Sequence, residues 1–351
     1  MKRELSVFSI AATYIGTVVG AGFASGQEVL QYFGYHGRAG YTGIIVATAI
    51  FVVYGYVILV LGNKLSADSY HNVVIFSTGA YLGRAVDWVI TFFLFVAFTA
   101  MIAGTGAIFK EQLGLPLIVG NIFMAIITLL TTLTGIAGII NAISAVVPVL
   151  ILGVFATGTY TLLTNPGSPF AGNVALNTTP ILPNPLLSGI VYASYNLVMA
   201  IAILVPLGKE INNKSNLFKG ALLGGIGLGT CALIIQTTLL LNMPEVSRYE
   251  IPMLFVTNKI SPVFTIVYSL ILISEIYSTA LGGLYGFVAR FTNAKSTKYV
   301  TYSVITTAAA LVCSQLGFSN MVRYLYSVVG IAGLILLGGL TYSVLSGKLS
   351  T

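Results

Sequence analysis

Two carboxylates lie inside long apolar stretches of this 351-residue chain, in the runs AGFASGQE and SEIYSTALGG. Burying an ionised carboxylate in hydrocarbon costs several kcal/mol unless it is paired or protonated. Glu275, one turn ahead of Ser278 and Thr279, is therefore a candidate proton site, ion ligand or binder of a cationic solute. Its alternative role is a structural hydrogen bond made while protonated. Glu28 is a candidate gate residue, or else a carboxylate satisfied within its own helical turn.

The first apolar stretch contains three closely spaced glycines, Gly20, Gly22 and Gly26. Glycines at this density free backbone amides and carbonyls from the helical ladder, and lipid tolerates such groups only where they line a cavity or bind something. An unwound centre with Ser25 beside it is therefore a predicted binding site. The alternative is that these glycines allow close packing between helices.

A second polar cluster lies near the centre of a later apolar stretch and comprises Tyr192, Ser194, Tyr195 and Asn196. Such side chains need hydrogen-bond partners when they are buried. The two segments open corresponding halves of the chain, and matching interruptions in two halves indicate an inverted repeat with a site at its midplane. We expect Phe23, Tyr192 and Tyr195 to line the pocket and Asn196 to contribute to it.

Composition identifies lipid as the solvent of this chain, because 57% of the residues are hydrophobic and only 7% are charged. The net charge of +7 comes from scattered Lys and Arg, which fits loops facing lipid headgroups better than a nucleic-acid stripe. Cys231 and Cys313 have no disulfide or metal spacing, and neither His36 nor His71 belongs to a zinc pattern. No catalytic set is recognisable, so we expect no enzyme and no cofactor other than a sodium ion.

A helix needs roughly 20 apolar residues to cross the membrane, and the sequence offers ten such segments. The predicted spans are Ser6–Phe33, Tyr41–Leu61, Ala85–Phe109, Leu117–Leu133, Ile136–Leu163, Leu186–Leu207, Phe218–Leu241, Val263–Ala289, Val300–Leu316 and Met321–Leu345. The predicted organisation is a first five-helix repeat over residues 1–163, an extracellular loop over 164–185 and a second repeat over 186–351.

The charges predict that both termini are cytoplasmic, because the inner side then holds eleven Lys and Arg and the outer side five. The five outer residues are Arg38, Lys110, Arg248, Lys259 and Arg323. The weakest point of the span count is the uncharged turn near Thr134 and Gly135.

Several other segments have specific expectations attached to them. The loops 164–185 and 242–262 could cap an outer vestibule or serve as ordinary linkers. The stretch 66–83 is a candidate interfacial helix, and Asp87 is expected to pair with Arg84. Asn141 and Ser144 either face the ion pathway or join helices by hydrogen bonds.

The run from Gly16 to Gly22, GTVVGAG, resembles the first-helix pattern G-N-A-V-G-L-G of neurotransmitter:sodium symporters. More loosely it resembles the glycine-rich first helix of the amino acid, polyamine and organocation (APC) superfamily. The whole chain resembles a minimal member of that superfamily, and AGFASGQE resembles the bacterial YkvI-like branch.

This resemblance implies an all-α membrane protein of ten helices with the LeuT-type five-plus-five fold, in which helices 1 and 6 are discontinuous. It implies that the amides of Ala21, Gly22 and Phe23 bind a solute carboxylate. It also implies a sodium site, and the residues that match it are the carbonyls of Gly16 and Val19 and the hydroxyls of Ser278 and Thr279. Oxygen ligands of this kind suit a hard cation.

Two departures from the pattern bear on the ion. Thr17 stands where the symporter pattern has Asn, which argues against a second sodium site. The fifth helix has no lysine at mid-span, and this favours an occupied ion site over a lysine that replaces the ion.

The leading functional prediction is a sodium- or proton-coupled symporter in the cell membrane. It would move an amino acid or a similar small polar or zwitterionic solute by alternating access. The alternative is a membrane receptor subunit that senses a small molecule on the same fold. A channel is disfavoured, since no carbonyl filter or charged ring is visible.

Overall fold

The computed structural model describes residues 6–67, 70–133, 152–164, 179–211, 213–292 and 296–347, and within these ranges the regular structure is entirely helical. Six helices are long and apolar enough to cross a membrane. A bent pair of helices and two shorter apolar helices, Val7–Val18 and Leu117–Thr132, add to them. The expectation of an all-α membrane protein is confirmed. Each predicted span contains described helical residues, although for Ile136–Leu163 these begin only at residue 152. The turn near Thr134 and the residues Asn141 and Ser144 lie outside the described residues.

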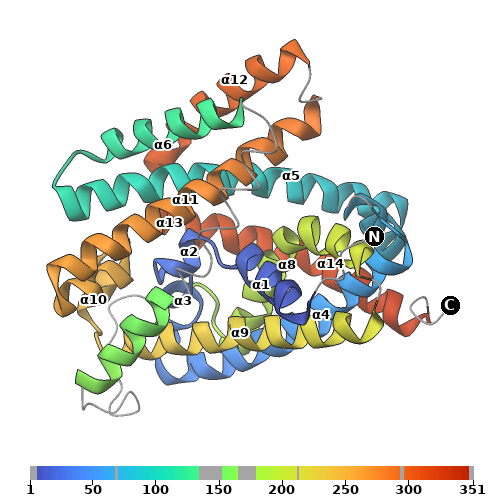
Figure 1. Cartoon of the computed structure of the whole chain (residues 1–351), viewed down its shortest axis with the longest axis horizontal. Helices are drawn as coiled ribbons and strands as arrows, with labels where there is room; N and C mark the ends of the chain where they lie inside the picture. The colour runs from blue at the N-terminus through green and yellow to red at the C-terminus, as the bar shows by residue number, and fades with distance from the viewer. Residues whose placement is uncertain are drawn as a thin grey trace.

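One layer of the molecule is a bundle of four helices (Figure 1). Its members are α1 (Val7–Val18), α4 (Gly40–Lys64), α8 (Pro185–Glu210) and α9 (Lys214–Leu240). Glycines bring the α4 and α8 backbones into direct contact. A Cβ atom on Gly62 would lie 2.2 Å from the Val205 carbonyl oxygen, and one on Gly208 would lie 2.2 Å from that of Leu59. Small residues of this kind allow helices to pack closely where lipid gives no hydrophobic driving force.

The second layer lies beside this bundle in Figure 1. Its helices α5 and α11 pack along each other, and α6 and α12 cover them. A left-handed residue, Gly79, kinks α5 and sets its first two turns apart from the rest. The members of this layer are α5 (Tyr70–Leu113), α6 (Leu117–Thr132), α11 (Pro262–Phe291) and α12 (Thr297–Cys313).

The last helix joins the two layers, because α14 (Ser327–Leu345) packs on α8 and on α5. Short segments precede it: η3 (Ser314–Leu316), α13 (Phe318–Asn320) and the π-helical η4 (Met321–Tyr326). The loop after α9 contains η2 (Glu245–Arg248) and α10 (Pro252–Ile260).

The first predicted span is divided into α1, α2 (Ala21–Ala24) and α3 (Gln27–Tyr32), and η1 (Gly34–Ala39) leads from it to α4. The prediction that its glycine run interrupts the helix is confirmed. Because α2 and α3 lie between the two layers, this interruption is at the centre of the molecule (Figure 1).

The sixth predicted span is also interrupted, although at a different place from the one expected. The residues from Tyr192 to Asn196 form regular helix within α8, so the prediction of a break there was wrong. The helix bends by 58° between Ile201 and Ile203 instead. Pro206 is the physical reason, because it has no N–H to donate and its ring clashes with the carbonyl four residues earlier.

Asp87 forms an ion pair as predicted, but the prediction of Arg84 as its partner was wrong. The Asp87 carboxylate accepts a hydrogen bond from the Arg290 guanidinium at 2.5 Å and a second from the Tyr70 hydroxyl at 3.2 Å. Arg84 instead donates to the Ala80 carbonyl and lies over the Tyr81 ring. Proximity in sequence suggested Arg84, whereas the packing of α5 on α11 supplies Arg290.

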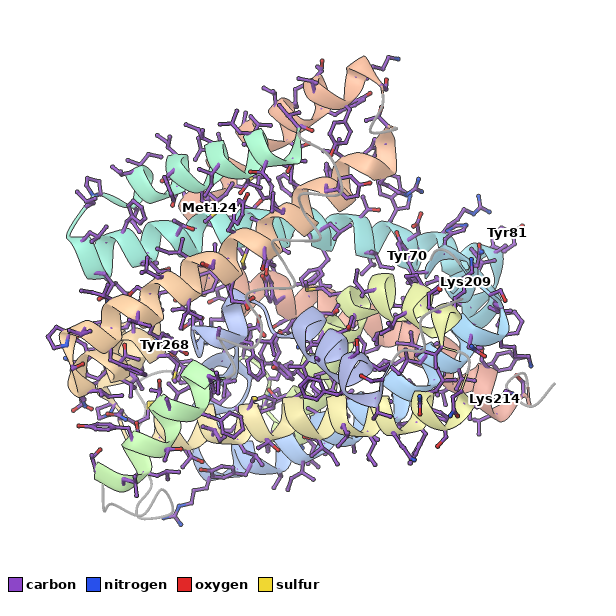
Figure 2. All side chains as sticks on the ribbon, in the orientation of Figure 1. Tyr70, Tyr81, Met124, Lys209, Lys214 and Tyr268 are labelled. Atoms are coloured by element: carbon purple, nitrogen blue, oxygen red, sulfur yellow. The ribbon has the colours of Figure 1, made fainter. Side chains whose placement is uncertain are left out.

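Helix α1 begins and helix α14 ends toward the same end of the molecule (Figure 1). Lys209 and Lys214, two of the residues expected on the inner side, lie at that end together with Tyr70 and Tyr81, whereas Tyr268 lies toward the opposite end (Figure 2).

Candidate functional site

The break between α1 and α2 exposes backbone groups that a continuous helix would pair. Val19 and Gly20 are extended, with ψ of 101° and −173°. The last hydrogen bond of α1 runs from the Val19 N–H to the Ile15 carbonyl at 2.7 Å, and the first of α2 runs from Ala24 to Gly20 at 3.0 Å. The carbonyls of residues 16–19 and the amides of residues 20–23 lie between these bonds and so lack intrahelical partners. They include the carbonyls of Gly16 and Val19 and the amides of Ala21, Gly22 and Phe23, for which the family resemblance implies contacts with an ion and with a solute.

Helix α11 lies against this break. A Cβ atom on Gly20 would be 3.4 Å from the Thr279 hydroxyl oxygen, which makes the two residues direct neighbours. The hydroxyls of Thr91, Thr99 and Thr105 donate to carbonyls one turn back in their own helix. By contrast, the Thr279 hydroxyl has no hydrogen-bond partner among the described residues. The lone pairs of the Thr279 hydroxyl are therefore available to a ligand beside the unpaired carbonyls at the end of α1.

Two more polar side chains of α11 accompany Thr279. The Ser278 hydroxyl donates to the Glu275 carbonyl at 2.9 Å, and its lone pairs remain able to accept. Glu275 is only 2% exposed, and its Oε1 atom has no partner among the described residues. Because residues four apart share a helix face, Glu275 and Thr279 both belong to the face that meets the break. The structure thus places the predicted ion ligands on the two elements that meet at Gly20.

The two flanks of the break differ in burial. Every residue from Ala21 to Gly34 is buried, whereas Gly16, Thr17, Gly20 and Thr279 are partly exposed. The break is therefore more open on the α1 side, toward the end of the molecule where α1 begins and α14 ends.

The Glu28 carboxylate folds back from α3 onto α2. Gly26 adopts the left-handed conformation, with φ of 78°, and turns the chain between these two short helices. A Cβ atom on Gly22 would lie 2.1 Å from Glu28 Oε1, so only glycine leaves room for the carboxylate there. The other oxygen, Oε2, accepts a short hydrogen bond from the Tyr195 hydroxyl of α8. Glu28 is thus a central residue that joins both broken spans, and its sequence interpretation as an outer gate did not foresee this contact.

Aromatic rings surround the Glu28–Tyr195 contact. Tyr195 lies 5.5 Å from Tyr32, 5.5 Å from Tyr192 and 5.3 Å from Tyr326, measured between ring centroids. Phe93 of α5 lies 5.9 Å from Tyr195. Further contacts bring Phe33 and Phe51 to Tyr192. We call these seven residues the aromatic cluster: Tyr32, Phe33, Phe51, Phe93, Tyr192, Tyr195 and Tyr326.

Other predicted pocket residues have local contacts. Ser25 accepts from the Gln27 amide and donates to the Gly22 carbonyl, so its hydroxyl stabilises the segment itself. Asn196 donates to the Tyr192 carbonyl within α8. Phe23 is buried on α2 and has no ring contact with the aromatic cluster in the described part of the chain. The hydroxyls of Tyr192 and Ser194 are buried and have no partner among the described residues.

The opposite flank of the break is covered by the loop after α9. The Met253 amide of α10 donates to the Ser25 carbonyl at 3.0 Å, and the Tyr268 hydroxyl of α11 donates to the Ala24 carbonyl at 2.8 Å. Glu250 fastens the loop to the start of the last span by accepting from the Phe318 and Ser319 amides. These contacts fasten the loop after α9 to the turn between α2 and α3 and to the start of the last span, while a cap over an outer vestibule stays a prediction.

Arg323 closes the same flank from the last span. Its guanidinium donates to the Gln31 side chain at 3.4 Å and to the Thr179 carbonyl at 2.8 Å. Its carbon Cζ lies 5.8 Å from the centre of the Tyr35 ring. The sequence analysis placed Arg323 on the outer side without a role, because its partners are distant in the chain.

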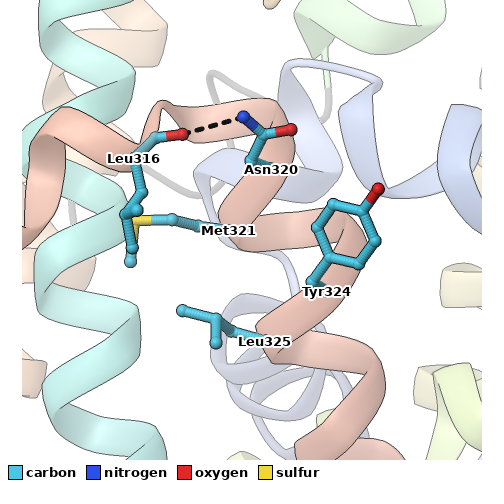
Figure 3. A pocket seen from close by; sticks show the side chains of 5 residues that line it. All are labelled: Leu316, Asn320, Met321, Tyr324 and Leu325. Atoms are coloured by element: carbon cyan, nitrogen blue, oxygen red, sulfur yellow. Dashed lines mark hydrogen bonds between the residues drawn. The ribbon is translucent and has the colours of Figure 1, made fainter.

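A pocket of about 300 Å³ opens at the start of the last span and is lined by Leu316, Asn320, Met321, Tyr324 and Leu325 (Figure 3). Asn320 is its polar residue and donates to the Leu316 carbonyl at 2.9 Å. The lining comes from one short stretch of chain and includes none of the groups at the break. We therefore place the candidate site at the break and not in this pocket.

Comparison with known proteins identifies two relatives of almost equal length, whereas no protein family model matches the chain. The uncharacterised membrane protein YkvI of Bacillus subtilis (strain 168) is 32% identical over 95% of each chain. The uncharacterised protein YyaD of the same organism is 26% identical over 92% of each chain.

Solved structures of transporters have the same fold. MhsT in complex with L-phenylalanine matches with a TM-score of 0.68 and 18% identity, over 99% of this chain and 95% of MhsT. Inward-facing Mhp1 matches with a TM-score of 0.63 and 14% identity, over 96% of this chain and 74% of Mhp1. A substrate-bound, outward-open Na⁺-coupled sialic acid symporter matches with a TM-score of 0.58 and 13% identity, over 95% of this chain and 79% of the symporter. The chain therefore has the LeuT-type fold that its first helix led us to expect.

Proposed function

Because the chain belongs to the family of the Bacillus subtilis membrane protein YkvI and has the LeuT-type fold, we propose that it is a secondary active transporter. In this proposal a cation, Na⁺ or H⁺, drives the movement of an amino acid or a similar small polar solute. The sialic acid symporter is described as Na⁺-coupled, and MhsT holds L-phenylalanine. Both descriptions support transport as the class of activity. The solute of this chain has to be inferred from the residues of its own site.

One observation supports the proposal above all others: the break at Val19–Gly20 lies directly against Thr279. Unpaired carbonyls of the first element thus lie near a hydroxyl of the second, and such oxygens are the kind of ligand that a hard cation prefers. The assigned ligands are the carbonyls of Gly16 and Val19 with the hydroxyls of Ser278 and Thr279. Glu275 adds a carboxyl group on the same helix face, which suits either charge compensation for Na⁺ or a transported proton.

The binding of the ion is coupled to the conformation of the protein because the assigned ion ligands belong to two different elements. The carbonyls belong to the broken first span, whereas the hydroxyls belong to α11 in the other layer. A cation that contacts both elements stabilises the arrangement in which they are close together. It therefore shifts the equilibrium between conformations by its difference in affinity for them. A solute that bridges α2, α3 and α8 favours the same closure, so ion and solute bind cooperatively.

The orientation that we assign places both termini in the cytoplasm. The arrangement is then closed outside by α10 and Arg323 and is more open inside, beside Gly16 and Thr279. We further propose that residues 1–163 and 186–351 are the two five-helix repeats, connected by the outer segment 164–185.

The test is uptake into proteoliposomes that contain the purified protein. A panel of radiolabelled amino acids and amines is presented while Na⁺ and H⁺ gradients are imposed separately. We expect accumulation above the external concentration with one of the two gradients, and its loss when an ionophore collapses that gradient. Saturable binding without accumulation under either gradient would instead support a receptor that uses the same fold.

A further inference from the structure

The surroundings of Glu28 define the chemistry of the solute more closely. We infer that the site recognises an organic cation, an amine or quaternary ammonium group, with Glu28 as its counter-ion and the tyrosines of the aromatic cluster as its cage. This inference deepens the proposed function, because it assigns the solute class of the same site. It departs from the expectation that the amides of Ala21, Gly22 and Phe23 hold a solute carboxylate.

Glu28 is a buried carboxylate with no cation beside it. It is 4% exposed, and it forms no ion pair with any described residue. The nearby Arg323 is directed to Gln31 and Thr179 instead. An ionised carboxylate in this environment is stabilised mainly by whichever positive charge approaches it, because water is excluded and Coulomb attraction is strong at low dielectric.

The rings around Glu28 are of the kind that bind ammonium groups. A cation is attracted to the negative face of an aromatic ring when it lies within about 6 Å of the centroid, and several rings together form the cages that hold quaternary ammonium ligands. Tyr195 contacts the carboxylate directly, while Tyr32, Tyr192 and Tyr326 lie 5.3–5.5 Å from Tyr195. A carboxylate bonded to one tyrosine of a four-tyrosine group offers charge attraction and ring attraction in the same part of the structure.

The position of the carboxylate also disfavours an anionic solute. Glu28 Oε1 lies against Gly22, beside the free amides of α2, which is where a solute carboxylate would otherwise be held. A second carboxylate placed there would be repelled at short range. The protein thus supplies the negative charge itself, and a solute that supplies only the positive charge completes the site.

The hydrogen bonds suggest how the cation enters. The Tyr195 hydroxyl now donates to Glu28. A protonated amine would replace it as the donor, whereas a quaternary ammonium group, which has no N–H, would be attracted to the carboxylate by its charge alone. The Tyr192 hydroxyl is buried without a partner in the described part of the chain and lies in the same cluster, so it can orient a polar group of the solute. Tyr195 belongs to α8 and Glu28 to α3, and the exchange of donor therefore couples solute binding to the relative position of the two broken spans.

The test measures binding of charge-matched probes to the purified full-length protein by isothermal titration calorimetry. One series keeps a phenyl ring and varies the charge: phenethylamine, L-phenylalanine and 3-phenylpropionate. A second pairs choline with its neutral isostere 3,3-dimethylbutan-1-ol. We expect the cation of at least one series to bind at least about tenfold more tightly than its neutral or anionic counterparts. For phenethylamine the reason is a hydrogen bond between charged groups, and for choline it is the attraction of its charge to the carboxylate and the rings.

Variants of Glu28 and Tyr195 test the contribution of the carboxylate charge separately from that of the aromatic rings. Glu28→Gln retains an acceptor for Tyr195 and should lower affinity for the cation at least about tenfold, whereas Glu28→Asp should restore part of it. Tyr195→Phe should retain cation binding, and Tyr195→Leu should weaken it more than it weakens any binding of the neutral isostere. Glu245→Gln, an exposed carboxylate-to-amide change on the outer loop, is the matched control and should leave binding unchanged.

The inference is overturned if 3-phenylpropionate binds best, if no cation outcompetes its isostere, or if Glu28→Gln binds the cation as well as the unchanged protein does. Tight binding of a cation without uphill uptake in proteoliposomes would support the inference and contradict the proposed transport. Uptake of an anionic or neutral solute against its gradient, unchanged by Glu28→Gln, would support the proposed transport and contradict the inference.

Discussion

Replacing Gly22 by alanine tests the central contact of the site with the smallest chemical change. The added Cβ would lie 2.1 Å from Glu28 Oε1, 2.7 Å from Cδ and 2.8 Å from Cγ. Ordinary van der Waals contact begins at 3.4 Å, so the carboxylate must move by at least 1.3 Å. Rotating the tip of the side chain is not sufficient, because Cγ is also too close. The move breaks the hydrogen bond to Tyr195.

The expected cost combines two effects. Overpacking a buried site costs about 1–3 kcal/mol, and a lost hydrogen bond to a charged group costs about 1.5–3 kcal/mol. Partial relaxation reduces their sum, and we expect a net cost of about 2–4 kcal/mol, which lowers the population of the closed arrangement by roughly 30-fold or more. Solute affinity and concentrative uptake should fall accordingly.

The assay compares Gly22→Ala with Gly338→Ala in proteoliposome uptake and in thermal stability in detergent. A Cβ atom on Gly338 would meet nothing within 4 Å, so this control adds the same methyl group without a clash. Uptake by Gly22→Ala within twofold of the unchanged protein, with normal stability, would refute the assigned position of Glu28.

Three further changes probe other parts of the account. Thr279→Ala removes a hydroxyl at the break and should raise the Na⁺ concentration needed for half-maximal uptake about tenfold, as measured by uptake at varied Na⁺; an unchanged Na⁺ dependence would contradict the ion site. Glu275→Gln removes a titratable group beside that site and should flatten the pH profile of uptake, which would remain unaltered if Glu275 were only structural. Asp87→Asn leaves the Arg290 guanidinium without its counter-ion and should lower the apparent melting temperature, because the pair fastens α5 to α11. Equal melting temperatures for Asp87→Asn and the unchanged protein would show that the pair contributes nothing measurable.

Composition and periodicity were sufficient to predict the membrane class and the break in the first helix. Gly20, Gly22 and Gly26 fall within seven residues, and the structure uses each differently. Gly20 lies in the break against Thr279, Gly22 makes room for Glu28, and Gly26 forms the left-handed turn. The composition of the run thus indicated where the helix ends, whereas the separate use of each glycine depends on neighbours from other helices.

The second interruption shows why a polar cluster is a weaker signal than proline. Tyr192 and Asn196 can remain in regular helix because Asn196 donates to the Tyr192 carbonyl one turn back. Pro206 can make no such adjustment and bends the helix beside Ile201. The sequence contained this signal, since proline inside a long apolar stretch predicts a kink about four residues earlier.

Long-range pairings could not be obtained from the sequence. Glu28 meets Tyr195, 167 residues away, and Asp87 meets Arg290, 203 residues away. Each depends on how two layers of helices pack, and local spacing suggested other roles or partners. This is the physical reason that the contacts among the candidate residues could not be predicted from the sequence.

The most direct measurement of the central claim is solute-driven ion entry. Proteoliposomes without any ion gradient are given the solute that binds most tightly, and the entry of ²²Na⁺ and of protons is followed separately. The account predicts that adding the solute outside drives one of these ions inward, and that Thr279→Ala diminishes the ion flux relative to the solute flux. Solute entry with no accompanying flux of either ion would contradict it.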